Sequence, residues 1–265
     1  MLPRAWEEKE VTELALEARQ GDVEFQRRLY TDPNATRRQL HCARRDWVLG
    51  HALQYSKPGD KLLEVGVGCG VFTEALSAAE REVTAVDINP AFLDNVRPLS
   101  HVTAHLKDAT RPLELGHHDV AICSEVLEHV PPASSEGMLK ALFDGLRPGG
   151  ILILTTPQRF STMELAARML RFKPLLALAR KIYGSADELG HINLLTSGQL
   201  KRQLLSAGFV PVKMERFGFY LPVAAEFGGN PGASVLKAAG NILDAIPGVR
   251  GLLWTQAWVL KRPAA

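Results

Sequence analysis

The stretch Leu62-Leu-Glu-Val-Gly66-Val-Gly68-Cys-Gly70 decides the fold of this chain. Its apolar run contains an acid, Glu64, near its end, and glycine then follows at every second position. This pattern is typical of a buried strand that turns tightly beneath a ligand. A loop without side chains lets the backbone approach a bound molecule closely, and the first N–H groups of the next helix point toward that molecule. The stretch therefore predicts a strand, a ligand-binding loop made by Gly66, Gly68 and Gly70, and a helix.

The loop differs in two ways from one that binds a dinucleotide. A dinucleotide loop has its third glycine one place later, where this chain has Val71, and it needs no acid at Glu64. An acid beside the loop instead suits a cationic ligand that donates hydrogen bonds. Taken alone, the glycines also allow the alternative of an ordinary strand-to-helix turn.

Acids also end the next two predicted strands. Asp87 closes the run 82–87, and its carboxylate suits both hydroxyls of a ribose. After the run 102–106, Asp108 is placed to accept from an adenine amino group, and the Ala109 N–H to reach a ring nitrogen. Each acid alone is more often a helix cap or a turn residue. Together with the acid of the glycine loop, however, they predict an adenosyl ligand such as S-adenosylmethionine.

Further segments complete a family pattern. The buried run 119–123, the segment 125–130 and the turn Arg147-Pro-Gly-Gly150 follow in order, and the strand 151–155 comes next. With these motifs the chain resembles the class I S-adenosylmethionine-dependent methyltransferases, particularly their quinone and small-molecule branch, over roughly residues 47–217. The resemblance implies an α/β fold, a doubly wound Rossmann-like sheet of seven strands whose last strand, within 253–260, is antiparallel. It also implies S-adenosylmethionine as the cofactor, with Ile88 and Ser124 joining the contacts named above.

Helical additions flank the motif block. Residues 1–57 are expected to form an N-terminal helical lid, with helices over 6–19, 22–30 and 34–55, ahead of a methyltransferase domain over 58–265. Relatives that share the resemblance use an arginine before the first strand to meet the cofactor carboxylate, which favours Arg44. A solvated cation on an exposed helix face is the alternative for this residue.

A helical insert is expected at about 158–190, after the fifth strand. It interleaves apolar and basic residues at helical spacing, and Pro174 is expected to break it in two. Such a segment suits a lid over a hydrophobic substrate pocket, or a helix lying on an anionic membrane surface. An amphipathic helix pair packed on the domain is the plain alternative.

Candidate catalytic residues follow the fourth strand. Methyl transfer is a direct displacement, and a base helps when a hydroxyl or an ammonium must lose its proton. His129 is the leading candidate, because it stands at the carboxyl edge of the sheet with Glu125 four residues before it and Glu128 adjacent. Either acid would orient the imidazole or hold a substrate amine. His191 is the second candidate base, and a histidine that caps a short helix is the alternative reading of His129.

Composition limits the remaining classes of function. The chain spreads 31 basic residues among 29 acidic ones, so no dense basic stripe suggests nucleic acid as a partner. Its three cysteines, Cys42, Cys69 and Cys123, lack metal-ligand spacing, so we expect no metal site and free thiols in a reducing cytoplasm. No apolar run reaches the length of a membrane span. Any membrane contact is therefore expected to be peripheral, through the insert.

The function expected from the sequence is methyl transfer to a small or lipid-like hydrophobic acceptor, with oxygen favoured over nitrogen. A noncatalytic regulatory protein that binds an adenosyl ligand is one alternative. A nicotinamide-dependent oxidoreductase is a weaker one, because its pyrophosphate would meet the Glu64 carboxylate. The sequence does not indicate the acceptor or the oligomeric state.

Overall fold

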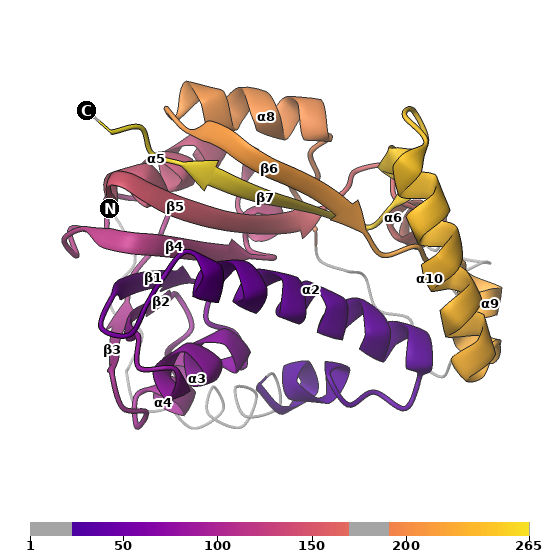
Figure 1. Ribbon diagram of the computed structural model, residues 1–265, viewed down its shortest axis with the longest axis horizontal. Helices are drawn as coiled ribbons and strands as arrows, with labels where there is room; N and C mark the ends of the chain where they lie inside the picture. Colours follow the sequence, from indigo (N-terminus) through magenta and orange to yellow (C-terminus); the bar gives the residue numbers. More distant parts are fainter. Residues whose placement is uncertain (1–22, 170–190, 265) are drawn as a thin grey trace, which may run out of the picture.

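A seven-stranded sheet forms the centre of the protein (Figure 1). The structure is a computed structural model that describes residues 23–169 and 191–264. The strand order is β3-β2-β1-β4-β5-β7-β6; the first five strands are parallel, and β7 is antiparallel to both of its neighbours. This confirms the predicted fold class. The strands are β1 Lys61–Val65, β2 Glu82–Asp87, β3 Val102–Leu106, β4 His118–Ser124, β5 Leu146–Pro157, β6 Val210–Phe217 and β7 Thr255–Lys261.

Helices cover both faces of the sheet (Figure 1). On one face, α2 and α3 pack against β1 and β4, and α5 and α8 pack on the opposite face. A short helix over 23–29 precedes α2. The other helices are α2 Ala35–Gln54, α3 Val71–Ala78, α4 Pro90–Val96, η1 Leu127–His129, η2 Pro132–Ser134, α5 Ser135–Asp144, α6 Thr162–Met169, α8 Ser197–Ser206, α9 Pro222–Phe227, α10 Gly229–Ala245 and η3 Arg250–Leu252.

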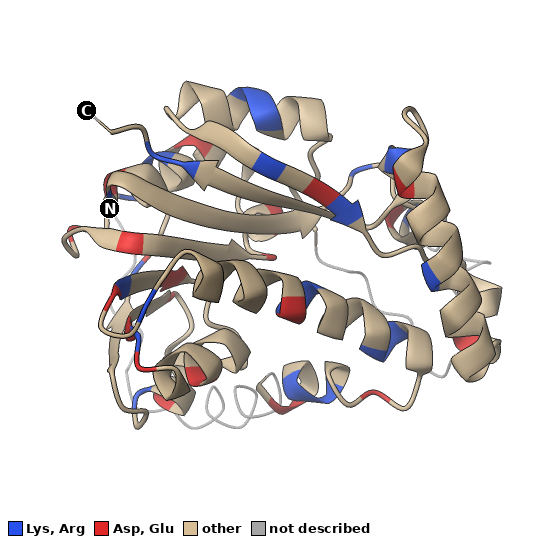
Figure 2. Cartoon of the chain, in the orientation of Figure 1, with Lys and Arg blue, Asp and Glu red and all other residues tan. Residues whose placement is uncertain are grey.

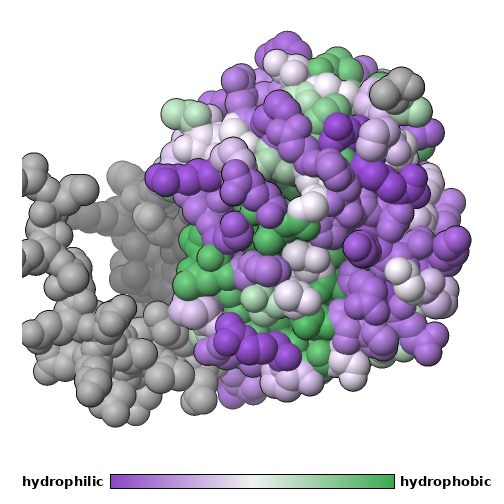
Figure 3. All heavy atoms as spheres, turned by 90° about the vertical axis from the view of Figure 1, so that its left-hand side faces the viewer, coloured by the Kyte–Doolittle hydropathy of each residue, from purple (hydrophilic) through white to green (hydrophobic). Residues whose placement is uncertain are grey.

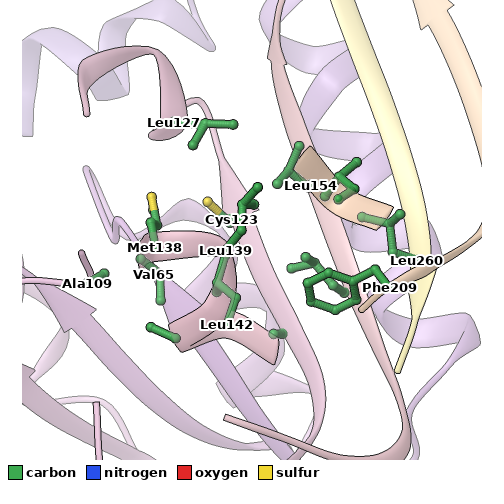
Figure 4. Packing of buried hydrophobic residues seen from close by; sticks show 14 of the residues in the cluster. Val65, Ala109, Cys123, Leu127, Met138, Leu139, Leu142, Leu154, Phe209 and Leu260 are labelled. Atoms are coloured by element: carbon green, nitrogen blue, oxygen red, sulfur yellow. The ribbon is translucent and has the colours of Figure 1, made fainter. Parts of the chain in front are cut away.

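The core explains the continuous apolar run of β4. Because side chains alternate along a strand, Val120 and Ile122 join the cluster beneath α2 and α3, whereas Ala121 and Cys123 join the cluster beneath α5 and α8. Figure 4 shows the second cluster, in which Cys123 lies among side chains of the neighbouring strands and of α5. A strand buried on both faces is apolar throughout, and β4 therefore fixes the centre of the sheet.

Residues before β1 have two structural roles. Helix α2 begins after Asn34, whose side chain accepts from the Arg37 N–H, and ends before Tyr55, close to the predicted bounds 34–55. Its C-terminal part packs into the core through Val48 and Ala52. Its N-terminal part lies over the cavity described below. The helix expected over 6–19 and most of the insert fall outside the described residues, so the division into lid, domain and insert remains a prediction.

Charges of both signs are distributed over the same helices and strands (Figure 2). The end of the molecule seen in Figure 3 is mostly hydrophilic, with smaller hydrophobic areas between the polar side chains. No helix among the described residues is long and apolar enough to cross a membrane.

Candidate functional site

A cavity of about 1470 Å³ opens at the carboxyl ends of β1, β2 and β4. Doubly wound folds bind their ligands at this edge of the sheet. The helix over 23–29, the N-terminal part of α2 and the segment around Tyr220 form its other walls. Much of the lining is apolar, through Phe25, Leu29, Leu40, Val67, Phe72, Phe92, Met138, Met163, Tyr220 and Trp254.

Most of the residues predicted for the site line this one cavity. Two predicted residues, Glu64 and Gly70, do not line it. Those that do are Arg44, Gly66, Gly68, Asp87, Ile88, Asp108, Ala109, Ser124, Glu125, His129 and His191.

The glycine loop needs its glycines for two reasons. Gly66, Gly68 and Gly70 all have positive φ angles, of 81°, 53° and 81°, which residues with a side chain rarely adopt. A Cβ at Gly66 would also lie 2.1 Å from Cγ2 of Val126, so the loop and the segment after β4 pack without any side chain between them. Gly70 serves as the N-cap of α3. The loop thus presents its backbone to the cavity, as predicted.

The acid of the loop motif does not line the cavity. Glu64 is buried on the α3 side of β1, where its Oε2 accepts from the Thr73 hydroxyl at 2.6 Å. Burial raises the pKa of its carboxyl to about 8, although the Thr73 hydrogen bond opposes this shift and Asp87 adds to it. In this structure Glu64 ties the strand before the loop to the helix after it. Any contact with the cofactor remains a prediction.

Asp87 holds the loop and also faces the cavity. One carboxylate oxygen accepts from the Val67 N–H at 2.8 Å and lies 3.5 Å from the Gly68 nitrogen, and the other accepts from the Asn89 N–H at 2.8 Å. Burial raises its pKa, and these backbone N–H groups counteract the shift. Ile88, the next residue, lines the cavity although its side chain is 74% exposed. The end of β2 thus offers a carboxylate and an apolar surface side by side.

Asp108 ends β3 in a local turn. Its Oδ1 accepts from both the N–H and the hydroxyl of Thr110, at 2.9 and 2.7 Å. These bonds lower the pKa of the Asp108 carboxyl. The turn brings Ala109, which is buried, to the cavity wall. Both residues predicted at the adenine position therefore lie at the same edge as Asp87.

An ion pair joins α2 to the end of β4. Nη1 of Arg44 lies 3.2 Å from Oε2 of Glu125, and both side chains are largely buried. Glu125 adopts a left-handed φ of 56°, uncommon for a residue with a side chain. Its other oxygen accepts from the Thr155 hydroxyl at 3.0 Å, which also lies 2.9 Å from the Ser124 hydroxyl. Arg44 is therefore not a solvated surface cation, and Glu125 is occupied with holding it.

A second α2 side chain supports this arrangement. Nδ1 of His41 lies 3.3 Å from Nη2 of Arg44. Burial lowers the pKa of His41 to about 3, and the positive charge of Arg44 adds to this shift. His41 is thus a neutral ring in the cavity wall, where it packs edge-on against Trp254.

The two predicted bases face each other. The rings of His129 and His191 lie 5.3 Å apart between centroids, at 64° to one another. Nδ1 of His191 lies 2.8 Å from Oε1 of Glu164, on α6, which fixes the position of this ring. His129 is exposed to the cavity, and Glu128 beside it is fully buried. The structure therefore brings together both candidates for the catalytic base.

Sequence reasoning missed the role of Glu164 and the proximity of His129 to His191. Glu164 lies 27 residues before its partner His191, in the predicted insert, and nothing in the local pattern marks it. Gln26, from the helix over 23–29, was missed as well; its Oε1 accepts from the Cys69 N–H at 3.0 Å at the glycine loop. Only the fold brings Gln26 to the cavity and Glu164 to His191.

The fold and the cavity define a class of protein, an α/β protein with an adenosyl-binding loop at its sheet edge. The sequence profile described as "Methyltransferase domain" matches residues 36–214. The chain belongs to this family and contains a class I S-adenosylmethionine-dependent methyltransferase domain, as the resemblance implied, with S-adenosylmethionine as the cofactor of that domain. The glycine loop, Asp87 and the Asp108–Ala109 turn, which the sequence predicts for that cofactor, all contribute to the lining of the cavity.

Similar proteins agree with this assignment. A ubiquinone biosynthesis O-methyltransferase of Psychrobacter arcticus is 31% identical over 161 residues, 57% of this chain and 59% of the relative. Magnesium protoporphyrin IX methyltransferase from Synechocystis PCC 6803 has a similar fold, with a TM-score of 0.59 and 16% identity over 97% of this chain and 100% of that one. The [4+2]-cyclase SpnF also shares the fold, with a TM-score of 0.57 and 19% identity over 88% and 85%. The chain spans about half the length of the curated relatives it matches.

Proposed function

We propose that this methyltransferase moves the methyl group of S-adenosylmethionine to a hydroxyl oxygen on a small or lipid-like hydrophobic acceptor. One observation carries the proposal: the His129–His191 pair and the glycine loop line the same largely apolar cavity. An apolar wall with a few polar groups is typical of sites that bind small hydrophobic molecules.

The cofactor would lie along the carboxyl edge of β1, β2 and β3. Backbone of Gly66 and Gly68 would approach its amino-acid part, and the carboxylate of Asp87 would accept from its ribose hydroxyls. Asp108 and Ala109 would meet the adenine, next to Ile88, and Ser124 lines the wall beyond the loop. Arg44 would reach the cofactor carboxylate from α2, at the cost of sharing its charge with Glu125.

The reaction itself needs little from the protein besides placement and a proton acceptor. The acceptor oxygen attacks the sulfonium methyl; the new O–CH₃ bond forms as the S–CH₃ bond breaks, and S-adenosylhomocysteine leaves. The hydroxyl proton passes to a base, for which His129 is the first candidate because it is the exposed member of the pair. His191 is the second candidate, held in place by Glu164.

Oxygen is preferred to nitrogen as the methylated atom for two reasons. The matching relatives carry the name O-methyltransferase, and a histidine pair suits deprotonation of a hydroxyl. A noncatalytic protein that binds an adenosyl ligand remains the second candidate, because a cavity suited to the cofactor does not by itself require methyl transfer. Membrane contact through the insert is a separate proposal, because most of the insert lies outside the described residues.

The proposal is tested by incubating the protein with methyl-labelled S-adenosylmethionine and a panel of hydrophobic phenols, fatty acids and amines. We expect label to enter a hydroxyl-bearing acceptor, and the product to be an ether or ester by mass spectrometry. Label in the amines alone would contradict oxygen methylation. Tight cofactor binding without labelled product on any acceptor or cell extract would favour the noncatalytic alternative.

A further inference from the structure

The neighbours of the histidine pair form a set of metal ligands. One ligand atom from each of Glu128, His129 and His191 lies within 4.8 Å of the others. In a tetrahedral site with bonds of about 2.1 Å, ligand atoms lie about 3.4 Å apart. The observed spacing is wider than this, so the ligand atoms would have to move closer together when a cation binds. Two imidazoles and a carboxylate are a donor set typical of divalent first-row transition metals.

A buried carboxylate oxygen points to a ligand independently of this spacing. Glu128 is 0% exposed and lines the cavity. Its Oε2 accepts from the Thr156 hydroxyl at 3.0 Å, whereas its Oε1 has no hydrogen-bond partner among the described residues. A buried acceptor without a donor destabilises the folded protein, and more so if the acceptor is charged. A cation bound at this oxygen would remove that destabilisation.

The second coordination sphere is already assembled. Oε1 of Glu164 lies 2.8 Å from Nδ1 of His191, which leaves Nε2 of that ring as the available ligand atom. Metal-binding histidines usually donate their other N–H to a carboxylate in this way. Glu164 itself is buried, so its position is fixed by the protein rather than by solvent.

The backbone joins the two segments that carry the ligands. The carbonyl oxygen of Glu128 accepts from the N–H groups of Ile192 and Asn193, at 2.9 and 3.0 Å. The side-chain amide of Asn193 donates in turn to the carbonyl of Leu127 at 3.1 Å. These bonds hold His191 beside η1 although the two segments are distant in the sequence, as a preformed site requires.

We infer that Glu128, His129 and His191 bind a divalent transition-metal cation, such as Zn²⁺ or Mn²⁺, on the acceptor side of the cavity. Three protein ligands leave a coordination position open toward the cavity, where the acceptor hydroxyl would bind. The inference rests on the proposed oxygen methylation for its purpose, but not for its test. It reverses the expectation from the sequence that the chain has no metal site.

A bound cation would change the proton step. It would lower the pKa of a coordinated hydroxyl, so that the O–H bond breaks and the proton leaves to solvent before or as the oxygen attacks the methyl group. The histidines would then hold the metal rather than the proton. Acceptors with an acidic hydroxyl, and above all two adjacent hydroxyls that can both bind the cation, would be preferred.

Metal binding is measured first without any acceptor, on untagged protein treated with a chelator. Calorimetry should show one site for Zn²⁺, with weaker binding of Mn²⁺, the order expected for nitrogen and oxygen donors. Cobalt absorption spectra in the visible range should show protein-bound Co²⁺ of low coordination number. If the parent protein binds Zn²⁺ no more tightly than the variants described below, the inference is overturned.

Three variants and one control locate the site. Glu128→Gln and His191→Ala should weaken Zn²⁺ binding at least about 100-fold, and Glu164→Gln by about 10- to 100-fold, because it removes only the outer partner of His191. The control His117→Ala changes an exposed histidine before β4 and should bind Zn²⁺ like the parent. Circular dichroism and S-adenosylmethionine affinity show whether each variant is folded. Equal Zn²⁺ affinity in folded Glu128→Gln and the parent would contradict the site.

Methyl transfer then separates this inference from the proposed function. If Zn²⁺ binds at the site but no hydroxyl acceptor is methylated, the metal site stands and the proposed function fails. If chelator-treated protein methylates hydroxyl acceptors at the same rate as the metal-loaded protein, the proposed function stands and the role of the cation in the proton step is overturned.

Discussion

The two sides of the cavity are built in different ways. On the cofactor side, backbone provides much of the surface: the glycine loop has positive φ angles, and Asp87 accepts from the N–H groups of that loop. On the proposed acceptor side, side chains provide the candidate catalytic groups, and they come from η1, α6 and the segment that begins at residue 191. One side depends on the path of the chain, and the other on a few functional groups.

This difference predicts which property a substitution on each side should change. A substitution on the cofactor side should appear as a loss of S-adenosylmethionine affinity, whereas one on the acceptor side should leave that affinity intact and lower turnover. Arg44 is predicted to contact the cofactor, and its partner Glu125 precedes Glu128 and His129 in the chain, so a change in this ion pair should affect both sides. The following experiments test that division, beginning with the largest expected effect.

His129→Ala should lower turnover by about 10²- to 10⁴-fold, the range for loss of a group that handles a proton. Whether His129 takes the proton itself or binds a cation, cofactor affinity should stay close to that of the parent. Steady-state kinetics and calorimetry measure the two quantities, with His117→Ala as the matched control. A folded variant with parental turnover would show that His129 has only a structural role.

Arg44→Met should destabilise the protein by about 3 kcal/mol, because it leaves the Glu125 carboxylate largely buried without its partner. Cofactor affinity should also fall. Urea denaturation gives the free energy of unfolding, and the double variant Arg44→Met, Glu125→Gln should recover part of the loss, since no unpaired charge remains. Additive effects of the two changes would contradict a direct interaction.

Asp87→Ala should weaken S-adenosylmethionine binding by about ten-fold or more, because a charge-assisted hydrogen bond is lost and the loop loses its acceptor. The Michaelis constant for the acceptor should change far less. Calorimetry and kinetics make the comparison, and Asp94→Ala, an exposed acid on α4, is the control. If cofactor affinity and the Michaelis constant for the acceptor worsened equally, the division between a cofactor side and an acceptor side would be wrong.

Glu64→Gln should have the smallest effect on methyl transfer and a clear effect on the pH dependence of stability. A carboxyl whose pKa rises from 4.5 to about 8 on folding contributes its full stability below pH 4.5 and loses it as the pH rises through 8. The parent should therefore lose this contribution between pH 5 and pH 9, whereas the glutamine variant should not. Chemical denaturation at these two pH values makes the test. The same pH dependence in both proteins would show that Glu64 does not titrate in this range.

Sequence reasoning named residues that mostly line one cavity on the proposed cofactor side, because these residues follow local rules. Strand, glycine loop, helix and terminal acid follow one another at fixed spacing, and the bounds predicted for α2, β2 and β3 were close to those observed. The orientation of Glu64 was less accessible, because a strand residue faces the cavity or the α3 side according to packing that one sequence does not specify. The Glu164–His191 pair was inaccessible, since its members meet only through tertiary structure.

The position of β7 has a consequence for the assembly of the sheet during synthesis. Although β7 follows every other strand in the chain, it lies inside the sheet, between β5 and β6, and β6 joins the sheet through it. The edge of β5 therefore remains open while the preceding residues are made, and its exposed backbone can pair with a foreign strand. Folding should end with the insertion of β7, a long-range pairing that is slow by its nature. A ribosome-bound chain that stops before residue 255 should be more prone to aggregation than the finished protein.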